Sequence, residues 1–216
     1  MRKGMEQFIH NPIYTITAES MSRGRSNIEV VAQMLKAGIK FIQYREKEKP
    51  GLDRYNECLK LREMTREAGA VFIIDDFVDL AMAVDADGVH VGQTDLPPQA
   101  VRSLIGPDKI IGWSTHEPAQ LDASNELGDI IDYIGVGPVY ATQTKKNAVP
   151  VGFSYVEYAA QHAKHPFVAI GGIKEHNICD VAAHGATTFA IVSEIVGADD
   201  IAAKIKSIEQ TLKNSK

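Results

Sequence analysis

Charged side chains stand directly after an apolar run near the start of this sequence. The segment QYREKEK places Arg45 and Lys47 two residues apart, so both side chains point to the same side of an extended chain. A guanidinium offers a forked pair of donors and an ammonium a point charge, and both suit phosphate groups. The pair predicts a polyanion site, although a solvated charged loop would have the same composition.

Carboxylates follow the next two apolar runs. Asp75 and Asp76 come directly after VFII, and Asp95 lies just beyond GVHV. Mg²⁺ is typically held by one or two carboxylates and completed by water and substrate phosphate, so these residues predict a magnesium site. Asp95 could instead cap a helix that begins near Pro97, and Asp79 could begin one after Asp76.

The segment IIGWSTHEP offers hydroxyl groups and an imidazole. Ser114, Thr115 or His116 could face a site here, with His116 a candidate proton carrier. A helix cap at Ser114 or Thr115, with Pro118 in the first turn, is the alternative.

Groups that bind phosphate follow the last three apolar runs. The one long connection, GVGPVYATQTKKNAVPVG, carries Thr142, Thr144, Lys145 and Lys146, although an unordered basic loop would look the same. Glycine lets backbone N–H groups approach an anion, and the start of a helix favours it. We therefore expect a phosphate pocket at the last two runs, which end in Gly171, Gly172, Val192 and Ser193.

Eight short apolar runs alternate with segments of helical spacing along the chain. The runs predict strands at Ile13–Thr17, Phe41–Arg45, Val71–Asp75, Gly88–Val91, Lys109–Ser114, Tyr133–Val136, Phe167–Ile170 and Thr188–Val192. The helices predicted between them are Asn27–Ala37, Leu52–Ala68, Val78–Ala83, Val101–Ile105, Ala119–Leu127, Tyr155–Ala163, Asn177–Ala183 and Asp199–Leu212. This alternation indicates an α/β protein with a parallel sheet.

About eight such pairs in 216 residues predict a (β/α)8 TIM barrel, with residues 1–216 forming a single domain. A doubly wound open sheet would usually carry a Gly-rich turn after its first strand, where this chain reads AESM. In a barrel the strand ends meet at one mouth. We therefore expect two anion pockets there, suited to transfer of a group from a departing diphosphate to a phosphorylated acceptor.

Composition excludes several other classes of protein. The net charge of -5, with no basic stripe, argues against a nucleic-acid partner. The start MRKGMEQFIHNP lacks the apolar stretch of a signal peptide, and no run approaches the ~18 apolar residues of a membrane span. We expect a cytoplasmic protein that acts on small molecules, with no membrane partner.

The sequence resembles the thiamine phosphate synthase (thiamine-phosphate pyrophosphorylase) family. The resemblance covers nearly the whole chain and rests on QYREK, FIIDDFVDLA, ADGVHVGQTDLP, IIGWSTH, YIGVGPVYATQTKK, VAIGGI and AIVSEI, in that order. It implies an Mg²⁺-dependent transferase that joins a hydroxymethylpyrimidine diphosphate to a thiazole phosphate. Diphosphate departs, the thiazole nitrogen attacks, and thiamine phosphate forms. Family analogy also allows a homo-oligomer.

The resemblance implies roles on the diphosphate side of the site. The cations that hold the diphosphate would be Arg45, Lys47 and Lys145. The ligands of Mg²⁺ would be Asp76 and Asp95. Gln43 would contact the pyrimidine, and Ser114 would hydrogen-bond near the diphosphate or the reacting carbon. The residues that act in catalysis would be Arg45, Ser114 and Lys145.

The resemblance also implies a thiazole phosphate site. The sequence departs from the family pattern in several places, and two of them concern the charge at the site. The residues of that site would be Thr142, Thr144, Gly172, Val192 and Ser193, the last three largely through their backbone. Asp75 stands in the substrate site where the family usually has Asn, and it could join the metal shell instead. Glu194 replaces a small residue and should weaken phosphate binding unless its carboxylate points away.

Three other functions remain open on such a barrel. A thiazole tautomerase of the same superfamily would generally lack the paired aspartates and the basic set. A sugar-phosphate isomerase or epimerase would need a placed acid–base pair and no diphosphate cluster. A non-catalytic regulator that binds a phosphorylated ligand would show no Mg²⁺-dependent turnover.

Overall fold

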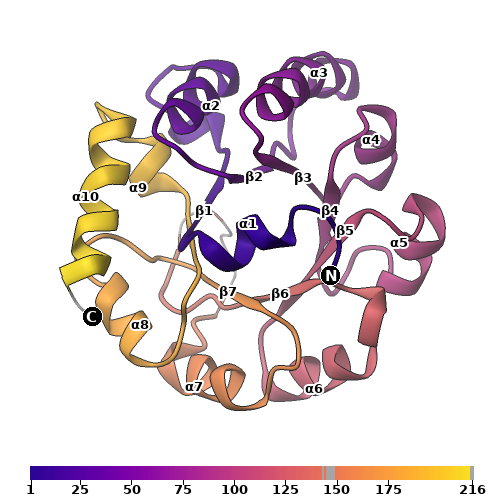
Figure 1. Ribbon diagram of the computed structural model, residues 1–216, viewed down its shortest axis with the longest axis vertical. Helices are drawn as coiled ribbons and strands as arrows, with labels where there is room; N and C mark the ends of the chain where they lie inside the picture. The colour runs from indigo at the N-terminus through magenta and orange to yellow at the C-terminus, as the bar shows by residue number, and fades with distance from the viewer. Residues whose placement is uncertain (143, 145–148, 215–216) are drawn as a thin grey trace.

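Eight parallel strands close into a barrel in the computed structural model, which describes residues 1–142, 144 and 149–214 (Figure 1). Each strand pairs with the next along the chain, and β8 pairs with β1 to complete the ring. The strands are β1 (Ile13–Ile16), β2 (Phe41–Tyr44), β3 (Val71–Asp75), β4 (Gly88–Val91), β5 (Ile110–Thr115), β6 (Tyr133–Val136), β7 (Phe167–Ile170) and β8 (Phe189–Ile191). The predicted (β/α)8 barrel is confirmed.

Helices surround the strands on the outside of the ring, apart from the first, which lies across one end of it (Figure 1). They are α1 (Met5–His10), α2 (Asn27–Lys36), α3 (Gly51–Glu67), α4 (Val78–Ala83), α5 (Pro98–Ile105), α6 (Pro118–Glu126), α7 (Gly152–His162), α8 (Ile178–Ala183), α9 (Ser193–Val196) and α10 (Ile201–Asn214), with short 3-10 turns η1 (Glu19–Met21) and η2 (Gly128–Ile130). The predicted helices are present with ends shifted by a few residues, and α1 and α9 are additional. Within the described parts of the chain, no helix has the length and apolar character needed to cross a membrane.

Residues of each strand alternate between two buried layers. In β3, Phe72 and Ile74 pack between the strands and the helices, whereas Val71 and Ile73 face the barrel interior. Successive side chains of a strand point to opposite faces. Burial on both faces explains why these strands have continuous apolar sequences.

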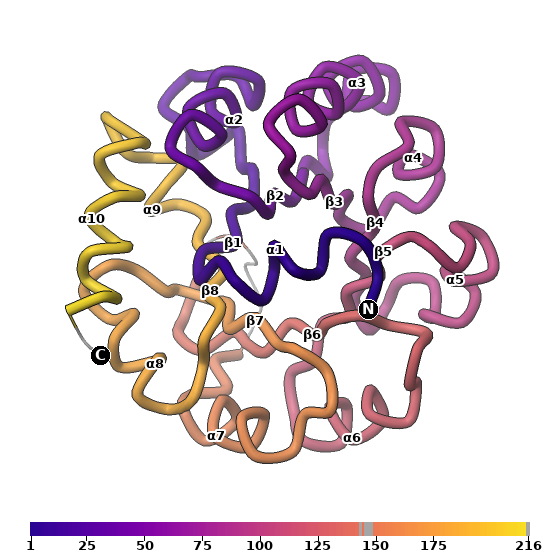
Figure 2. Tube along the Cα trace, in the orientation of Figure 1, coloured from indigo at the N-terminus to yellow at the C-terminus, as the bar shows by residue number. Residues whose placement is uncertain are grey.

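Helix α1 lies across the opening at the N-terminal ends of the strands (Figure 2). Phe8, which is 1% exposed, packs its ring 4.7 Å from that of Tyr133 and 5.3 Å from that of Phe41. Met5 is equally buried beside them. The helix therefore closes this end of the barrel, and the opposite end is left for a ligand.

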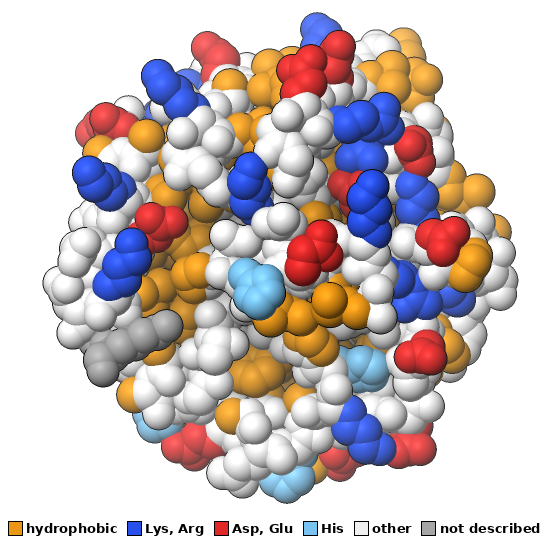
Figure 3. All heavy atoms as spheres, in the orientation of Figure 1, with side chains coloured by type: hydrophobic (Ala, Val, Ile, Leu, Met, Phe, Trp, Pro, Cys, Tyr) orange, Lys and Arg blue, Asp and Glu red, His pale blue; other side chains and the backbone are white. Residues whose placement is uncertain are grey.

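Acidic and basic side chains are interspersed around the rim of the face that α1 covers (Figure 3). At this end Asp85 pairs with Arg66 at 3.0 Å and with Lys109 at 2.5 Å, which links the segments around α3, α4 and β5. In barrels of this kind the N-terminal face contributes to stability, and the C-terminal face carries function.

Candidate active site

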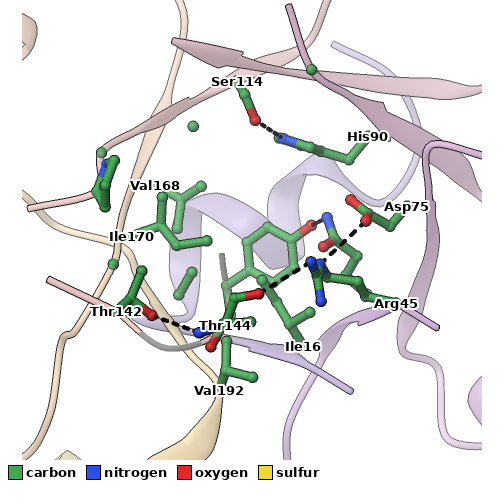
Figure 4. A pocket seen from close by; sticks show the side chains of 18 of the residues that line it. Ile16, Arg45, Asp75, His90, Ser114, Thr142, Thr144, Val168, Ile170 and Val192 are labelled. Atoms are coloured by element: carbon green, nitrogen blue, oxygen red, sulfur yellow. Dashed lines mark hydrogen bonds and ion pairs between the residues drawn. The ribbon is translucent and has the colours of Figure 1, made fainter. Parts of the chain in front are cut away.

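A cavity of about 350 Å³ opens at the C-terminal ends of the strands (Figure 4). All eight strands contribute residues to its lining. The predicted site residues that line it are Gln43, Arg45, Lys47, Asp75, Asp76, Asp95, Ser114, Thr142, Thr144, Gly172, Val192 and Ser193. Barrel closure thus brings together residues from seven separate segments. The predicted Lys145, with its neighbour Lys146, lies outside the described residues.

Cations and carboxylates meet on one side of this cavity. Lys47 Nζ lies 2.6 Å from Asp76 Oδ2, and Arg45 Nε lies 3.5 Å from Asp75 Oδ2. These residues lie at the ends of β2 and β3, which are neighbours in the barrel. Burial lowers the pKa of Lys47, but its hydrogen bond with Asp76 and the charges of both carboxylates outweigh burial and raise that pKa overall. Lys47 therefore keeps its charge, and both cations are held at the mouth.

The carboxylates themselves are crowded. Burial, followed by the charge of Asp76, raises the pKa of Asp75 to about 7. Burial also raises the pKa of Asp76; Lys47 opposes this shift, and the charge of Asp95 adds to it. Asp76 adopts a left-handed backbone with φ of 61°, a conformation that side chains other than glycine seldom take outside functional sites.

The donor set fits Mg²⁺. Asp76 and Asp95 lie close enough to hydrogen-bond through their side chains, and this contact raises the pKa of Asp76. Mg²⁺ needs one or two protein carboxylates when substrate phosphate completes its shell, and a divalent cation would relieve the repulsion between them. Across the described residues no three His, Cys, Asp or Glu side chains converge on one metal position, so a complete protein cage is not built here.

The alternative roles of Asp95, Ser114 and Thr115 as helix caps are wrong, whereas Asp79 does stand in the first turn of α4. Helix α5 follows Pro97 with no side-chain cap, and Asp95 Oδ2 instead accepts a hydrogen bond from the N–H of Gly92 at 2.7 Å. Helix α6 follows Glu117, also without a side-chain cap. Ser114 lines the cavity, whereas the buried Thr115 donates its hydroxyl proton to the backbone of the neighbouring strand.

The other side of the cavity is built from the ends of β6, β7 and β8. A Cβ atom at Gly172, where φ is 64°, would lie 2.7 Å from the backbone oxygen of Ala141. The glycine therefore allows the β7 and β6 loops to touch. In the β6 loop Thr144 N–H donates to Thr142 Oγ1 at 3.2 Å, and Arg45 Nη2 donates to Thr144 O at 3.4 Å. The arginine thus joins the two sides.

Glu194 points away from the cavity. Its carboxylate lies 3.3 Å from Lys204 Nζ on α10, and Lys204 also pairs with Glu175 at 2.8 Å. The neighbouring Ser193 lines the cavity, whereas Glu194 does not. Glu194 was expected to weaken phosphate binding unless its carboxylate pointed away. Since it does point away, its charge does not stand in the proposed phosphate site.

A hydrogen-bonded chain of side chains forms the floor of the cavity. Gln43 Nε2 donates to Tyr14 Oη at 2.8 Å, and Tyr14 Oη lies 2.9 Å from Tyr133 Oη. Tyr133 Oη lies 3.0 Å from His90 Nδ1. His90 Nε2 lies 2.9 Å from Ser114 Oγ (Figure 4). His90 is thus a hydrogen-bonded residue within β4.

Sequence reasoning missed Tyr14 and Tyr133 in this floor, although two glycines offered a signal. Gly112 and Gly135 lie inside β5 and β6, and glycine within a strand often marks a close approach. A Cβ at Gly112 would lie 2.2 Å from Tyr133 Cζ and 2.4 Å from His90 Nδ1. The missing side chain makes room for both rings.

A family model described as thiamine monophosphate synthase matches residues 13–195. The chain belongs to this family. It is 59% identical over 208 residues to the thiamine-phosphate synthase of Pelotomaculum thermopropionicum, which covers 96% of this chain and 94% of that protein. It is 52% identical to the thiamine-phosphate synthase of Caldicellulosiruptor saccharolyticus, with 93% of this chain and 90% of that protein covered.

A solved structure agrees with this membership. Thiamine phosphate pyrophosphorylase from Pyrococcus furiosus superposes with a TM-score of 0.84 at 32% identity, covering 94% of this chain and 96% of that one. The family predicted from the sequence is confirmed, and the chain is a transferase of thiamine biosynthesis. A tryptophan synthase α-subunit from the same organism, at 12% identity and a TM-score of 0.65, shares the fold alone.

Proposed function

We propose that this chain condenses hydroxymethylpyrimidine diphosphate with thiazole phosphate to give thiamine phosphate and diphosphate, in an Mg²⁺-dependent reaction. The observation that carries the proposal is one cavity with two different anion-binding sides. Arg45 and Lys47 lie with carboxylates on the first side. Glycine and hydroxyl residues from the ends of β6, β7 and β8 form the second.

The first side suits a departing diphosphate. The bond between the hydroxymethyl carbon and the diphosphate oxygen breaks, and its electron pair leaves with the oxygen. Arg45 and Lys47 neutralise this developing charge, and fixed charges of this kind cost no reorganisation during the reaction. The electron-rich aminopyrimidine stabilises the carbon left behind, with Gln43 in contact with the ring. We propose that Lys145 acts with these cations, because it lies in the sequence segment after β6 that resembles the family.

Asp76 and Asp95 are proposed as the metal ligands. Bound there, Mg²⁺ would neutralise diphosphate charge and orient the leaving group. Asp75 adds a further carboxylate beside the cations, 3.5 Å from Arg45 Nε and 3.9 Å from Lys47 Nζ. It stands in the substrate site as a counter-charge to them.

The second side suits the acceptor. Thr142, Thr144 and Ser193 offer hydroxyl donors, and the backbones of Gly172 and Val192 can approach a phosphate. Holding that phosphate would aim the thiazole nitrogen at the hydroxymethyl carbon, where the new carbon–nitrogen bond forms. Two reactants held in a productive geometry react far faster than free ones. The proposed mechanism therefore needs no protein nucleophile.

Purified protein with both phosphorylated precursors and Mg²⁺ is the test. We expect thiamine phosphate, detected by chromatography after oxidation to its fluorescent derivative, and an equal amount of released diphosphate. Omitting either precursor or chelating the metal should abolish both products. No product from fresh precursors with metal would contradict the proposal.

Two alternative functions give different outcomes in the same assay. A tautomerase would isomerise the thiazole carboxylate phosphate without any pyrimidine substrate. A regulator would bind the phosphorylated compounds without turnover. The paired aspartates and the basic residues at the cavity favour the synthase over both.

A further inference from the structure

The hydrogen-bonded floor of the cavity has two alternative directions, because each hydroxyl has one proton to give. Gln43 Nε2 donates to Tyr14 Oη, and in the direction that this sets, the proton of Tyr14 goes to Tyr133 Oη, 2.9 Å away. In that direction Tyr133 Oη accepts this hydrogen bond and donates its own proton to His90 Nδ1, 3.0 Å away. The orientation of the Gln43 amide in β2 thus influences hydrogen bonds on the opposite side of the barrel.

The direction continues through the imidazole. A neutral histidine that accepts at Nδ1 carries its proton on Nε2. In the same direction His90 Nε2 donates to Ser114 Oγ, 2.9 Å away. The oxygen of Ser114 is used as an acceptor, and its hydroxyl proton is free to point into the cavity that Ser114 lines.

We propose that Gln43, Tyr14, Tyr133, His90 and Ser114 form one directional relay that makes Ser114 a hydrogen-bond donor to the anionic substrate. His90, Tyr133 and Tyr14 are positioning residues in this scheme, since they act through Ser114. The inference rests on the proposed function in one respect, which is that the group beside Ser114 is a diphosphate.

Burial holds the relay in one protonation state. Both tyrosine side chains are enclosed in the barrel, and burial raises the pKa of each phenol well above its usual value. Each therefore keeps its proton and can donate only once. Gly112 provides the space in which the His90 and Tyr133 rings meet.

The opposite direction would harm binding of an anion. It needs the Gln43 amide turned so that Oε1 faces Tyr14, after which every bond in the chain reverses. Ser114 would then donate to His90 Nε2 and present lone pairs to the diphosphate. The polarity of the relay therefore decides whether Ser114 attracts or repels the leaving group.

The protonated nitrogen of His90 is measurable in the free protein. Long-range proton–nitrogen NMR distinguishes the two neutral tautomers, and a His90→Gln variant assigns the signal by its disappearance. We expect the proton of His90 on Nε2. His116 is an internal reference in the same cavity, because its Nδ1 lies 2.5 Å from Gly137 O, an acceptor, and must carry a proton. A His90 protonated on Nδ1, or on both nitrogens, would overturn the relay.

Two variants that each remove one buried hydroxyl separate the relay from general packing. Tyr133→Phe removes the donor to His90 Nδ1, so we expect a mixture of tautomers and a kcat roughly 10-fold lower, the size of one lost hydrogen bond. Tyr14→Phe leaves Tyr133 able to donate, so the His90 tautomer should be unchanged. The same tautomer result in both variants would contradict the directional scheme.

The two proposals can fail separately. The tautomer is measured without substrate, so a protein that makes no thiamine phosphate could still show His90 protonated on Nε2. If the protein makes thiamine phosphate but His90 is protonated on Nδ1, the proposed function stands and the relay is contradicted.

Discussion

Asp75 places a carboxylate against the cations that are proposed to receive the diphosphate. Its side chain is 11% exposed and lies within ion-pair distance of Arg45 and Lys47. In the free protein these contacts partly neutralise the two cations, so an incoming diphosphate must compete with Asp75. The family usually has an amide here, which carries no charge.

Asp75→Asn should therefore tighten binding of the pyrimidine diphosphate. We expect a KM for this substrate roughly 5-fold lower, since a partly screened ion pair contributes up to about 1 kcal/mol. Steady-state kinetics at saturating thiazole phosphate measures it. Asp79→Asn makes the same chemical change at an exposed position of α4, outside the cavity lining, and should leave KM unchanged. An unchanged or higher KM in Asp75→Asn would show that the carboxylate acts otherwise, for instance on the metal.

At the scale of elements, α10 controls the charge beside the proposed thiazole phosphate site. Lys204 holds Glu194 on the outer side of α9, next to Ser193. A freed Glu194 carboxylate would add negative charge close to the bound phosphate. The helix thus compensates for an acidic residue where the family has a small one.

Lys204→Ala should raise the KM for thiazole phosphate about 3-fold, the scale of a partly exposed charge contact. The KM for the pyrimidine diphosphate should not change. A double variant, Lys204→Ala with Glu194→Gln, should restore the normal value, and Lys206→Ala on the same helix serves as the matched control. If the double variant remains as impaired as the single one, Glu194 is not the cause.

The strands and the helices between them could be predicted because their apolar patterns are local. The strand β3 was predicted with its observed ends, and most candidate site residues line the cavity because strand ends are visible in the sequence. Helix α1 could not be predicted, since MEQFIH is too short to show a period and is stabilised by packing against strands far along the chain. The Tyr14–Tyr133 contact joins residues 119 positions apart, and only barrel closure creates it.

At the scale of the whole molecule, the closed N-terminal end and the functional floor share the same aromatic residues. Phe8 contacts the rings of Tyr14, Phe41 and Tyr133. The hydroxyl groups of both tyrosines belong to the series of hydrogen bonds that ends at Ser114, on the cavity side. Stability and site geometry are therefore coupled through one layer of the barrel.

Phe8→Ala should lower the free energy of unfolding by about 3 kcal/mol, as expected for a truncated buried aromatic. Urea denaturation followed by circular dichroism measures the change. Ile9→Ala on the same helix removes a side chain that is 48% exposed and should cost far less. Equal losses in the two variants would mean that α1 is not held by its buried face.

Helix α1 also leaves the C-terminal end as the side from which a ligand reaches the cavity. Because α1 covers the N-terminal end, the two precursors and both products of the proposed reaction enter and leave at the C-terminal end, where the cavity opens. A thiamine phosphate that remains bound in the cavity would block the sites of both precursors. Turnover in the proposed reaction then depends on how quickly thiamine phosphate leaves through the C-terminal opening.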